Sequence, residues 1–189
     1  MYGIDEETIK YLYELVFCNK VEVCMYMSKQ HNILYVKDKS LNEGSIMYYD
    51  EGKSRGMCRY KSKYERYICH THPYNFRAYP SLEDIMKVIK HKLLIDVSII
   101  PTRWGIWTIV NKNKKIDISD LNITKINEYI NKLGYIENKL GYKDNIYLTD
   151  IKPQLSEIKE ISNKLSKHSL LNIKFVDWNS LSVNNPECN

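Results

Sequence analysis

The chain has 189 residues, of which 43% are hydrophobic and 27% charged, and its formal net charge at pH 7 is +5. This length predicts one domain with one substantial core. The positive charge is spread along the chain, which favours solubility and does not by itself indicate a nucleic-acid-binding protein.

Cysteine usage and the apolar segments bear on the location of the protein. The five cysteines are scattered and lack Cys-x-x-Cys spacing, so we expect neither a disulfide framework nor a cysteine-based zinc knuckle. The first residues are acidic, unlike a signal peptide. The longest apolar stretch, residues 93–100, is interrupted by Asp96 and is too short to span a bilayer. We therefore expect a soluble intracellular protein, in the cytoplasm or the nucleus, with no membrane partner.

Residues 5–18 predict an amphipathic helix, because apolar side chains recur at helical spacing and acidic residues occupy the first turn. Residues 20–28 alternate as a β-strand does, which separates their polar side chains from their apolar ones. Residues 33–36 and 46–49 predict further strands. The charged segment 50–66 predicts a loop.

The middle of the chain predicts a strand, a loop and a helix in succession. Residues 66–72 form the strand, residues 73–80 the proline-punctuated loop, and residues 81–92 the helix. Residues 95–110 then predict a β-hairpin with its turn at 101–103.

Three further elements are predicted for the last part of the chain: a helix over 120–133 followed by a turn region marked by Gly134 and Gly141, a helix that begins at Pro153, and a strand over 171–176. No internal repeat or inter-domain linker is visible in the pattern. We therefore expect a single α/β (α+β) domain over residues 1–178, followed by a polar tail at 179–189.

Two histidines at the end of the 66–72 strand are candidate metal ligands. Residues two apart on a strand point to the same side, so His70 and His72 present their imidazoles together. Pro73 favours the extended backbone that this arrangement requires. Asp84 can supply a third ligand once the intervening loop folds the helix start back beside the strand. Two imidazoles, a carboxylate and one open position suit a catalytic zinc ion.

Each part of this cluster also has a purely structural explanation. A His-x-His pair can occur by chance, and Ser81 with Asp84 matches a helix capping box, worth about 1 kcal/mol. Their combination in this order favours the metal site, and Ser81 can cap the helix and still face a water molecule. His91 cannot share an ion with Asp84, because it lies two turns further along the helix, roughly 10 Å away at a rise of about 1.5 Å per residue. The histidines expected at the surface are His31, His91 and His168.

This constellation resembles the motif of the JAB1/MPN/Mov34 metalloproteases, the JAMM family. The family pattern is His-x-His-Pro, a spacer and Ser-x-x-Asp, and the chain matches it from His70 to Pro73 and from Ser81 to Asp84. The family also has a glutamate on an early strand that follows a first helix. Glu22 occupies the matching place here.

The resemblance implies an MPN-like domain with a curved mixed β-sheet flanked by helices. It implies that His70, His72 and Asp84 bind Zn²⁺. It further implies that Glu22 is the general acid/base and that Ser81 helps to bind the water or the tetrahedral oxyanion. Active members of the family most often cut after the C-terminus of ubiquitin or a ubiquitin-like protein. The expected activity is therefore a zinc-dependent isopeptidase or peptidase that hydrolyses ubiquitin or ubiquitin-like conjugates through a metal-activated water.

The sequence departs from the family pattern in two respects. The spacer between His72 and Ser81 has eight residues where seven is typical, a difference that a loop tolerates. Met25 and Lys29 stand where the family usually has glycines, so the packing around Glu22 is expected to differ. The structural alternative for Glu22 is an exposed carboxylate on a strand.

Two other functions are compatible with parts of the sequence. Many relatives of JAMM enzymes lack the ligands and act as non-catalytic MPN-type protein-interaction modules, whereas the ligand set is present here. The segment 53–67 interleaves lysine and arginine with tyrosine, as proteins that bind single-stranded nucleic acid can. A solvated loop that leads to the strand with the two histidines explains that segment better, so nucleic acid is not the expected partner.

Overall fold

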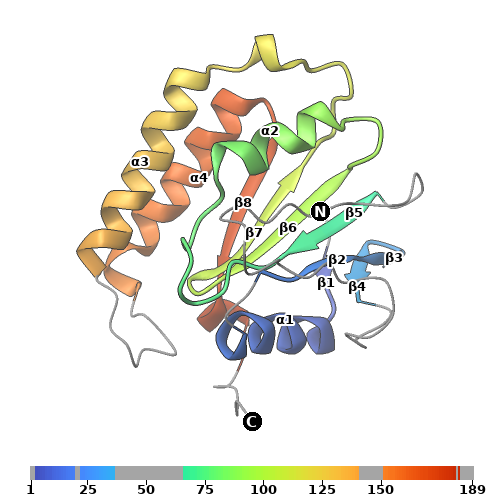
Figure 1. Cartoon of the computed structure of the whole chain (residues 1–189), viewed down its shortest axis with the longest axis vertical. Coiled ribbons are helices and arrows are strands. Elements are labelled where there is room, and N and C mark those ends of the chain that lie inside the picture. The colour runs from blue at the N-terminus through green and yellow to red at the C-terminus, as the bar shows by residue number, and fades with distance from the viewer. Residues whose placement is uncertain (1–2, 20–21, 37–65, 141–150, 182, 184–189) are drawn as a thin grey trace, which may run out of the picture.

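A mixed five-stranded β-sheet lies at the centre of the molecule, with helices on both of its faces (Figure 1). The computed structural model describes residues 3–19, 22–36, 66–140, 151–181 and 183. The strand order is β2-β5-β6-β7-β8, in which β5 and β6 are parallel and the other neighbours are antiparallel. These strands are β2 (Cys24–Tyr26), β5 (Tyr67–His70), β6 (Val97–Thr102), β7 (Gly105–Val110) and β8 (Asn172–Asp177).

A smaller sheet of three short strands, in the order β1-β4-β3, lies beside α1 (Figure 1). Its strands are β1 (Gly3–Ile4), β3 (Ser28–Gln30) and β4 (Ile33–Tyr35). The helices of the described residues are α1 (Glu6–Cys18), α2 (Leu82–Lys90), α3 (Ile123–Leu140) and α4 (Leu155–Ser169), with short 3-10 turns at Ile118–Asp120, Lys152–Gln154 and Trp178–Leu181.

Two hydrophobic cores fill the space on the two faces of the central sheet. Helices α2, α3 and α4 pack on one face, where Trp107 and Ile100 are completely buried. Helix α1 packs on the other face, where Cys69 and Ile99 are completely buried. Successive residues of a strand point to opposite faces, so a strand buried on both sides supplies both cores.

Local signals place the helix ends. Asp5 caps α1 by accepting a hydrogen bond from the Thr8 N–H at 3.0 Å, and Glu6 and Glu7 follow in the first turn, where the helix dipole favours negative charge. Leu12 and Val16 are then fully buried at the helical spacing that the sequence predicted. The mixture of helices and strands confirms the predicted α+β class.

Two predicted elements have different bounds in the structure. The strand predicted over 20–28 is divided: β2 pairs with β5 in the large sheet, and β3 begins at Ser28 and pairs with β4 in the small one. The hairpin turn lies at residues 103–104 and not at 101–103, because Thr102 still pairs with Gly105. The strand expected at 46–49 and the loop expected at 50–65 lie outside the described residues.

The turn predicted at Gly134 is wrong, because this residue lies inside α3, which continues to Leu140. The absence of a side chain at this position allows Tyr79 to pack closely against the helix. A Cβ atom at this position would lie 2.8 Å from the hydroxyl oxygen of Tyr79, a residue of the loop before α2. Gly134 therefore permits the loop to approach the helix.

The cysteines also differ from expectation. Cys18 and Cys24 are each disulfide-bonded, although their number and scatter did not predict a disulfide. Cys69 is free and buried. Within the described parts of the chain, no helix combines the length and the apolar character that crossing a membrane requires.

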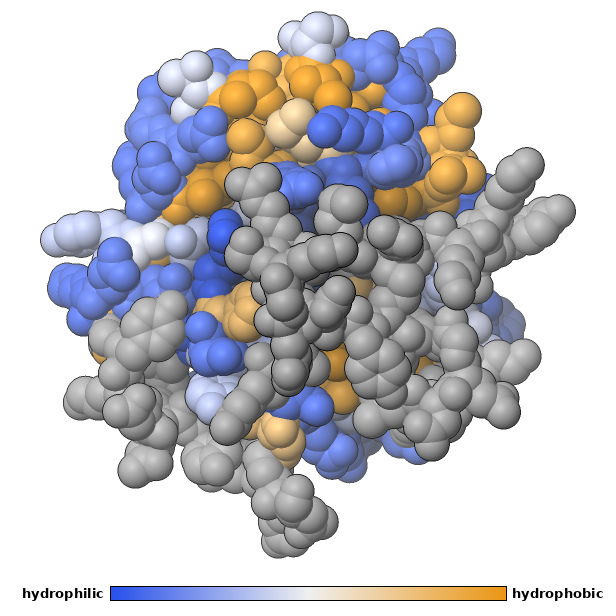
Figure 2. Space-filling model, in the orientation of Figure 1, coloured by the Kyte–Doolittle hydropathy of each residue, from blue (hydrophilic) through white to orange (hydrophobic). Residues whose placement is uncertain are grey.

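Hydrophobic residues gather in the upper part of the surface in Figure 2, in the region of α2 and of the chain that leads to α3, with polar residues around them. Leu93 and Leu94, in the turn that follows α2, are among the exposed apolar side chains, with exposed fractions of 77% and 41%. The outer surface of the helical layer is therefore not uniformly polar.

We expect Gly134→Ala to lower the stability of the protein, although alanine favours a helix interior by about 1 kcal/mol over glycine. The added methyl group would lie 2.8 Å from the hydroxyl oxygen of Tyr79 and 3.7 Å from its ring carbon Cζ, so the hydroxyl is the group that must move. In a Tyr79→Phe background the same substitution should stabilise. Urea denaturation of the four proteins of this double-mutant cycle measures the coupling. Equal effects of Gly134→Ala in both backgrounds would contradict the close-approach explanation.

Candidate metal centre

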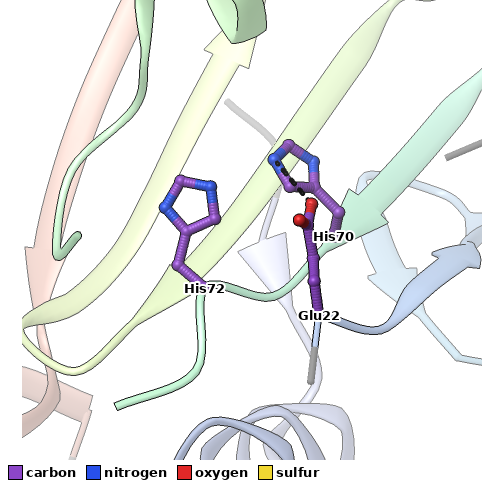
Figure 3. A group of neighbouring side chains, drawn as sticks. All are labelled: Glu22, His70 and His72. Carbon is purple, nitrogen blue, oxygen red and sulfur yellow. Dashed lines mark ion pairs between the residues drawn. The ribbon is translucent and has the colours of Figure 1, made fainter. Parts of the chain in front are cut away.

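Glu22, His70 and His72 converge at one edge of the central sheet (Figure 3). One ligand atom from each of the three residues lies within 4.8 Å of the others. The two imidazole ring centres are 5.2 Å apart. His70 is the last residue of β5, and Glu22 lies two residues before β2, the antiparallel neighbour of β5. The pairing of these two strands therefore brings together residues that are far apart in the sequence.

Asp84 adds a second carboxylate to the cluster from the first turn of α2. Its Oδ1 atom lies 3.1 Å from Nε2 of His70, and its Oδ2 atom lies 3.8 Å from Nε2 of His72. The side chains are largely shielded from solvent, with exposed fractions of 14% for Asp84, 3% for His70 and 7% for His72. The structure thus brings the three predicted ligands together.

Ser81 forms a capping box with Asp84. The Ser81 hydroxyl and main-chain N–H both donate to Oδ2 of Asp84 at 2.7 Å, and the Asp84 N–H donates to the Ser81 hydroxyl at 3.1 Å. This reciprocal arrangement starts the helix and also orients the carboxylate, so that Oδ1 faces His70. The capping explanation therefore holds, and a contact of Ser81 with a water or an oxyanion stays a prediction.

His72 has the tautomer that a metal ligand needs. Its Nδ1 atom lies 3.1 Å from the main-chain carbonyl oxygen of Arg77. A carbonyl oxygen only accepts hydrogen bonds, so we assign the ring proton to Nδ1, which leaves the Nε2 lone pair free. Burial lowers the pKa of His72 to about 4, so the ring is neutral at pH 7.

His70 occupies the position between the two carboxylates. Its Nε2 atom lies 3.8 Å from Oε1 of Glu22 and 3.1 Å from Oδ1 of Asp84. Burial acts to lower the pKa of His70, but the two negative charges outweigh burial and the pKa is raised. Its Nδ1 atom is buried and has no hydrogen-bond partner among the described residues. The two carboxylates thus favour positive charge at this position.

Glu22 is the more exposed of the two carboxylates in the cluster. Its side chain is 21% exposed, more than that of either histidine. Burial raises the pKa of Glu22, and the positive charges of His70, Lys87 and Arg77 oppose that effect. A carboxyl group with a raised pKa exchanges protons more readily near neutral pH. Met25, near Glu22, is buried in the core on the α1 side, and Lys29 lies in β3.

A buried ion pair that the sequence did not predict holds the loop between His72 and Ser81. Arg103, in the β6–β7 turn, contacts Glu137 of α3 at 2.8 Å, and both are buried. Arg103 also donates to the main-chain oxygens of Tyr74 and Phe76, at 2.9 and 3.1 Å. Glu137 accepts the N–H of Ala78 at 2.7 Å. The pair therefore binds the main chain of the loop at three residues.

Further contacts complete the attachment of this loop. The indole N–H of Trp107 donates to the carbonyl oxygen of Ala78 at 3.0 Å. The main-chain N–H of Tyr74 donates to the carbonyl oxygen of Val16 in α1 at 2.9 Å. The loop that separates the ligands is thus held by the sheet and by helices from both of its faces. Sequence periodicity contains no signal for these contacts, because they join residues distant in the chain.

Of the histidines expected at the surface, His31 and His91 are exposed. His168 is half-buried and stacks on Tyr129 with ring centres 5.7 Å apart. Most of the basic, tyrosine-rich segment 53–67 lies outside the described residues. The five residues that the sequence predicted for the site lie together in the structure: Glu22, His70, His72, Ser81 and Asp84.

The chain matches no family model, no curated protein and no solved structure. The residues themselves must therefore indicate which ion fits. Two imidazole nitrogens and a carboxylate, shielded from solvent and with a fourth group beside them, form a donor set typical of zinc. The hydrogen bond from His72 to a main-chain carbonyl is the kind of support that zinc-binding histidines usually have.

We expect Glu137→Gln to destabilise the protein by about 3–5 kcal/mol, because Arg103 would remain buried without a countercharge. The loop would also hold Asp84 less firmly, so affinity for zinc should fall. Urea denaturation and zinc titration measure the two effects.

Glu128→Gln is the matched control on the same helix. Glu128 pairs with Lys125 and Lys132 at the surface, with a side chain 40% exposed, so this variant should behave as the wild type. A small effect of similar size for both variants would show that the buried pair does not hold the loop.

Proposed function

We propose that this protein is a zinc-dependent isopeptidase or peptidase of the JAMM type, acting on ubiquitin or ubiquitin-like conjugates. The observation that supports the proposal is the convergence of Nε2 of His70, Nε2 of His72 and the Asp84 carboxylate, with Glu22 beside them. A capping box alone would require only Ser81 and Asp84. It would not require two imidazoles and a second carboxylate at the same place.

The proposal gives each residue the role that the family resemblance implies. His70, His72 and Asp84 would hold the zinc ion. When bound, zinc acts as a Lewis acid that lowers the pKa of water from about 15.7 to about 7. Glu22 accepts a proton from the attacking water and transfers it to the leaving nitrogen as the carbon–nitrogen bond breaks. The products are a carboxylate and an amine.

Neighbouring groups set the protonation or the orientation of His72, Asp84 and Glu22 in a way that suits these roles. Burial keeps His72 neutral, as a ligand must be, and the Arg77 carbonyl keeps its Nε2 atom unprotonated. Ser81 prevents the Asp84 carboxylate from rotating away. Glu22 is oriented toward His70 and remains partly open to solvent, so that water can reach it.

Both the substrate class and the hydrolysis of a peptide or isopeptide bond come from the family resemblance, and the site supports them with a donor set for a metal and a carboxylate beside it. A ubiquitin-type substrate corresponds to a location in the cytoplasm or the nucleus. Disulfides are typical of oxidising compartments and are rare in the cytosol. The proposed location therefore requires Cys18 and Cys24 to be reduced in the cell, which thiol labelling in cell extracts would measure.

We expect the purified protein to bind one zinc ion per chain and to lose it on Asp84→Ala. Elemental analysis after gel filtration measures the stoichiometry, and zinc should also raise the unfolding temperature of the wild type alone. His91→Ala is the control, because His91 is an exposed histidine at the end of the same helix. Loss of zinc in both variants, or no zinc in the wild type, would contradict the metal site.

We expect Glu22→Gln to lower kcat by about 10²- to 10⁴-fold, because the amide cannot accept the proton of water. Zinc content should not change. The assay follows cleavage of di-ubiquitin chains of every linkage, of C-terminal ubiquitin fusions and of ubiquitin-like conjugates. Glu14→Gln, at an exposed position of α1, is the control.

Two results would redirect the proposal. Zinc-loaded wild type that cleaves none of these conjugates would remove the ubiquitin-type substrate. Zinc-free protein that folds normally and captures a conjugate without cutting it would favour the non-catalytic interaction module.

A further inference from the structure

We propose that Thr71, the residue between the two histidines, is a positioning residue that holds Glu22 beside the metal ligands. The inference rests on the proposed function, in which Glu22 is the base. It concerns a residue that the His-x-His pattern treats as a spacer. Thr71 is completely buried, so its hydroxyl needs a role within the protein.

Thr71 makes two hydrogen bonds to one residue of the neighbouring chain segment. Its main-chain N–H donates to the carbonyl oxygen of Val23 at 2.9 Å. The N–H of Val23 donates in return to the side-chain oxygen of Thr71, also at 2.9 Å. Both main-chain groups of Val23, the residue that directly follows Glu22, are therefore held by Thr71.

The second of these bonds differs from ordinary strand pairing. Cys24 pairs with His70, so Val23 is opposite Thr71 in the continuing antiparallel register. In a regular ladder a hydrogen-bonded pair exchanges two main-chain bonds, and the Val23 N–H would then donate to the Thr71 carbonyl. The hydroxyl takes the place of that carbonyl here.

On its other edge the same chain segment pairs regularly with β6. The N–H of His72 donates to the carbonyl oxygen of Pro101 in β6 at 2.8 Å, which continues the parallel pairing of β5 with β6. Thr71 is therefore the residue that extends the pairing with β2 by one position toward Glu22. Glu22 is thereby held next to His70, with 3.8 Å between Oε1 and Nε2.

A residue without a hydroxyl at position 71 would leave the Val23 N–H without its partner. Val23 is itself buried, with an exposed fraction of 4%, so this group has little access to water as a substitute. The segment that carries Glu22 would move to satisfy the N–H. Misplacement of a catalytic group by about 1 Å can cost about 100-fold in rate.

The test compares Thr71→Val, which has nearly the same shape and no hydroxyl, with Thr71→Ser, which retains the hydroxyl. The matched control is Thr8→Val. Thr8 is 1% exposed, and its side-chain oxygen accepts the Val36 N–H at 3.0 Å, so this variant loses a bond of the same chemistry. Thr8 lies in the first turn of α1, at the opposite end from Val16, which contacts the ligand loop.

We expect both valine variants to lose similar stability and only Thr71→Val to lose activity. In Thr71→Val, kcat should fall by about 10- to 100-fold with little change in KM, zinc stoichiometry should persist, and hydrogen exchange of the Val23 amide should accelerate. Thr71→Ser should restore both kcat and the slow exchange of the Val23 amide. In a Glu22→Gln background, Thr71→Val should have no further effect on kcat, because Thr71 acts only through Glu22.

A crystal structure of zinc-loaded Thr71→Val decides the inference independently of activity. The Glu22 carboxylate should be displaced from His70 relative to the wild-type structure. An unchanged Glu22 position, or full kcat despite fast exchange at Val23, would overturn the positioning role. If the wild type cleaves no conjugate and Glu22 is nevertheless displaced in the variant, the proposed function fails and the positioning role stands.

Discussion

The buried ion pair between Arg103 and Glu137 is the interaction on which the candidate site depends. The loop between His72 and Ser81 must leave the sheet and return so that α2 begins beside the strand it came from. Such a loop carries main-chain groups that need partners once they are buried. Arg103 and Glu137 supply those partners from a hairpin and a helix on either side. Each charge also neutralises the other, which makes their burial tolerable.

At the candidate site, as in the Arg103–Glu137 pair, buried charges of opposite sign compensate for each other. Glu22 and Asp84 bring two carboxylates into a region with little solvent, which is unfavourable unless positive charge lies between them. His70 lies at that position, and its raised pKa reflects the attraction. A divalent cation satisfies the same requirement more strongly. The hydrogen bond to the Arg77 carbonyl orients the His72 ring, so that its Nε2 atom faces the same region.

The site lies at the end of β5, a strand that is paired on both of its edges, and this explains how one short segment can hold so many groups. β5 pairs with β2 on one edge and with β6 on the other, and the His72 N–H continues the pairing with β6. Thr71 extends the pairing with β2 by offering a hydroxyl in place of a main-chain acceptor. Strand pairing therefore positions Glu22 and the two histidines. Met25, which stands where the resembled family has a glycine, fills the core on the far face and leaves the site unobstructed.

Sequence patterns predicted most of the local structure and the group of residues that lie together at the candidate site. The cap at Asp5, the apolar spacing of the helices and the alternation of the strands are properties of neighbouring residues, so periodicity predicts them. The motif likewise brings its ligands within fifteen residues of one another. Only the tertiary structure decided the role of Gly134, of the Arg103–Glu137 pair and of Thr71. Each of these depends on a partner far away in the chain, and the physical reason is that a close approach or a buried hydrogen bond has no periodic signature in the sequence.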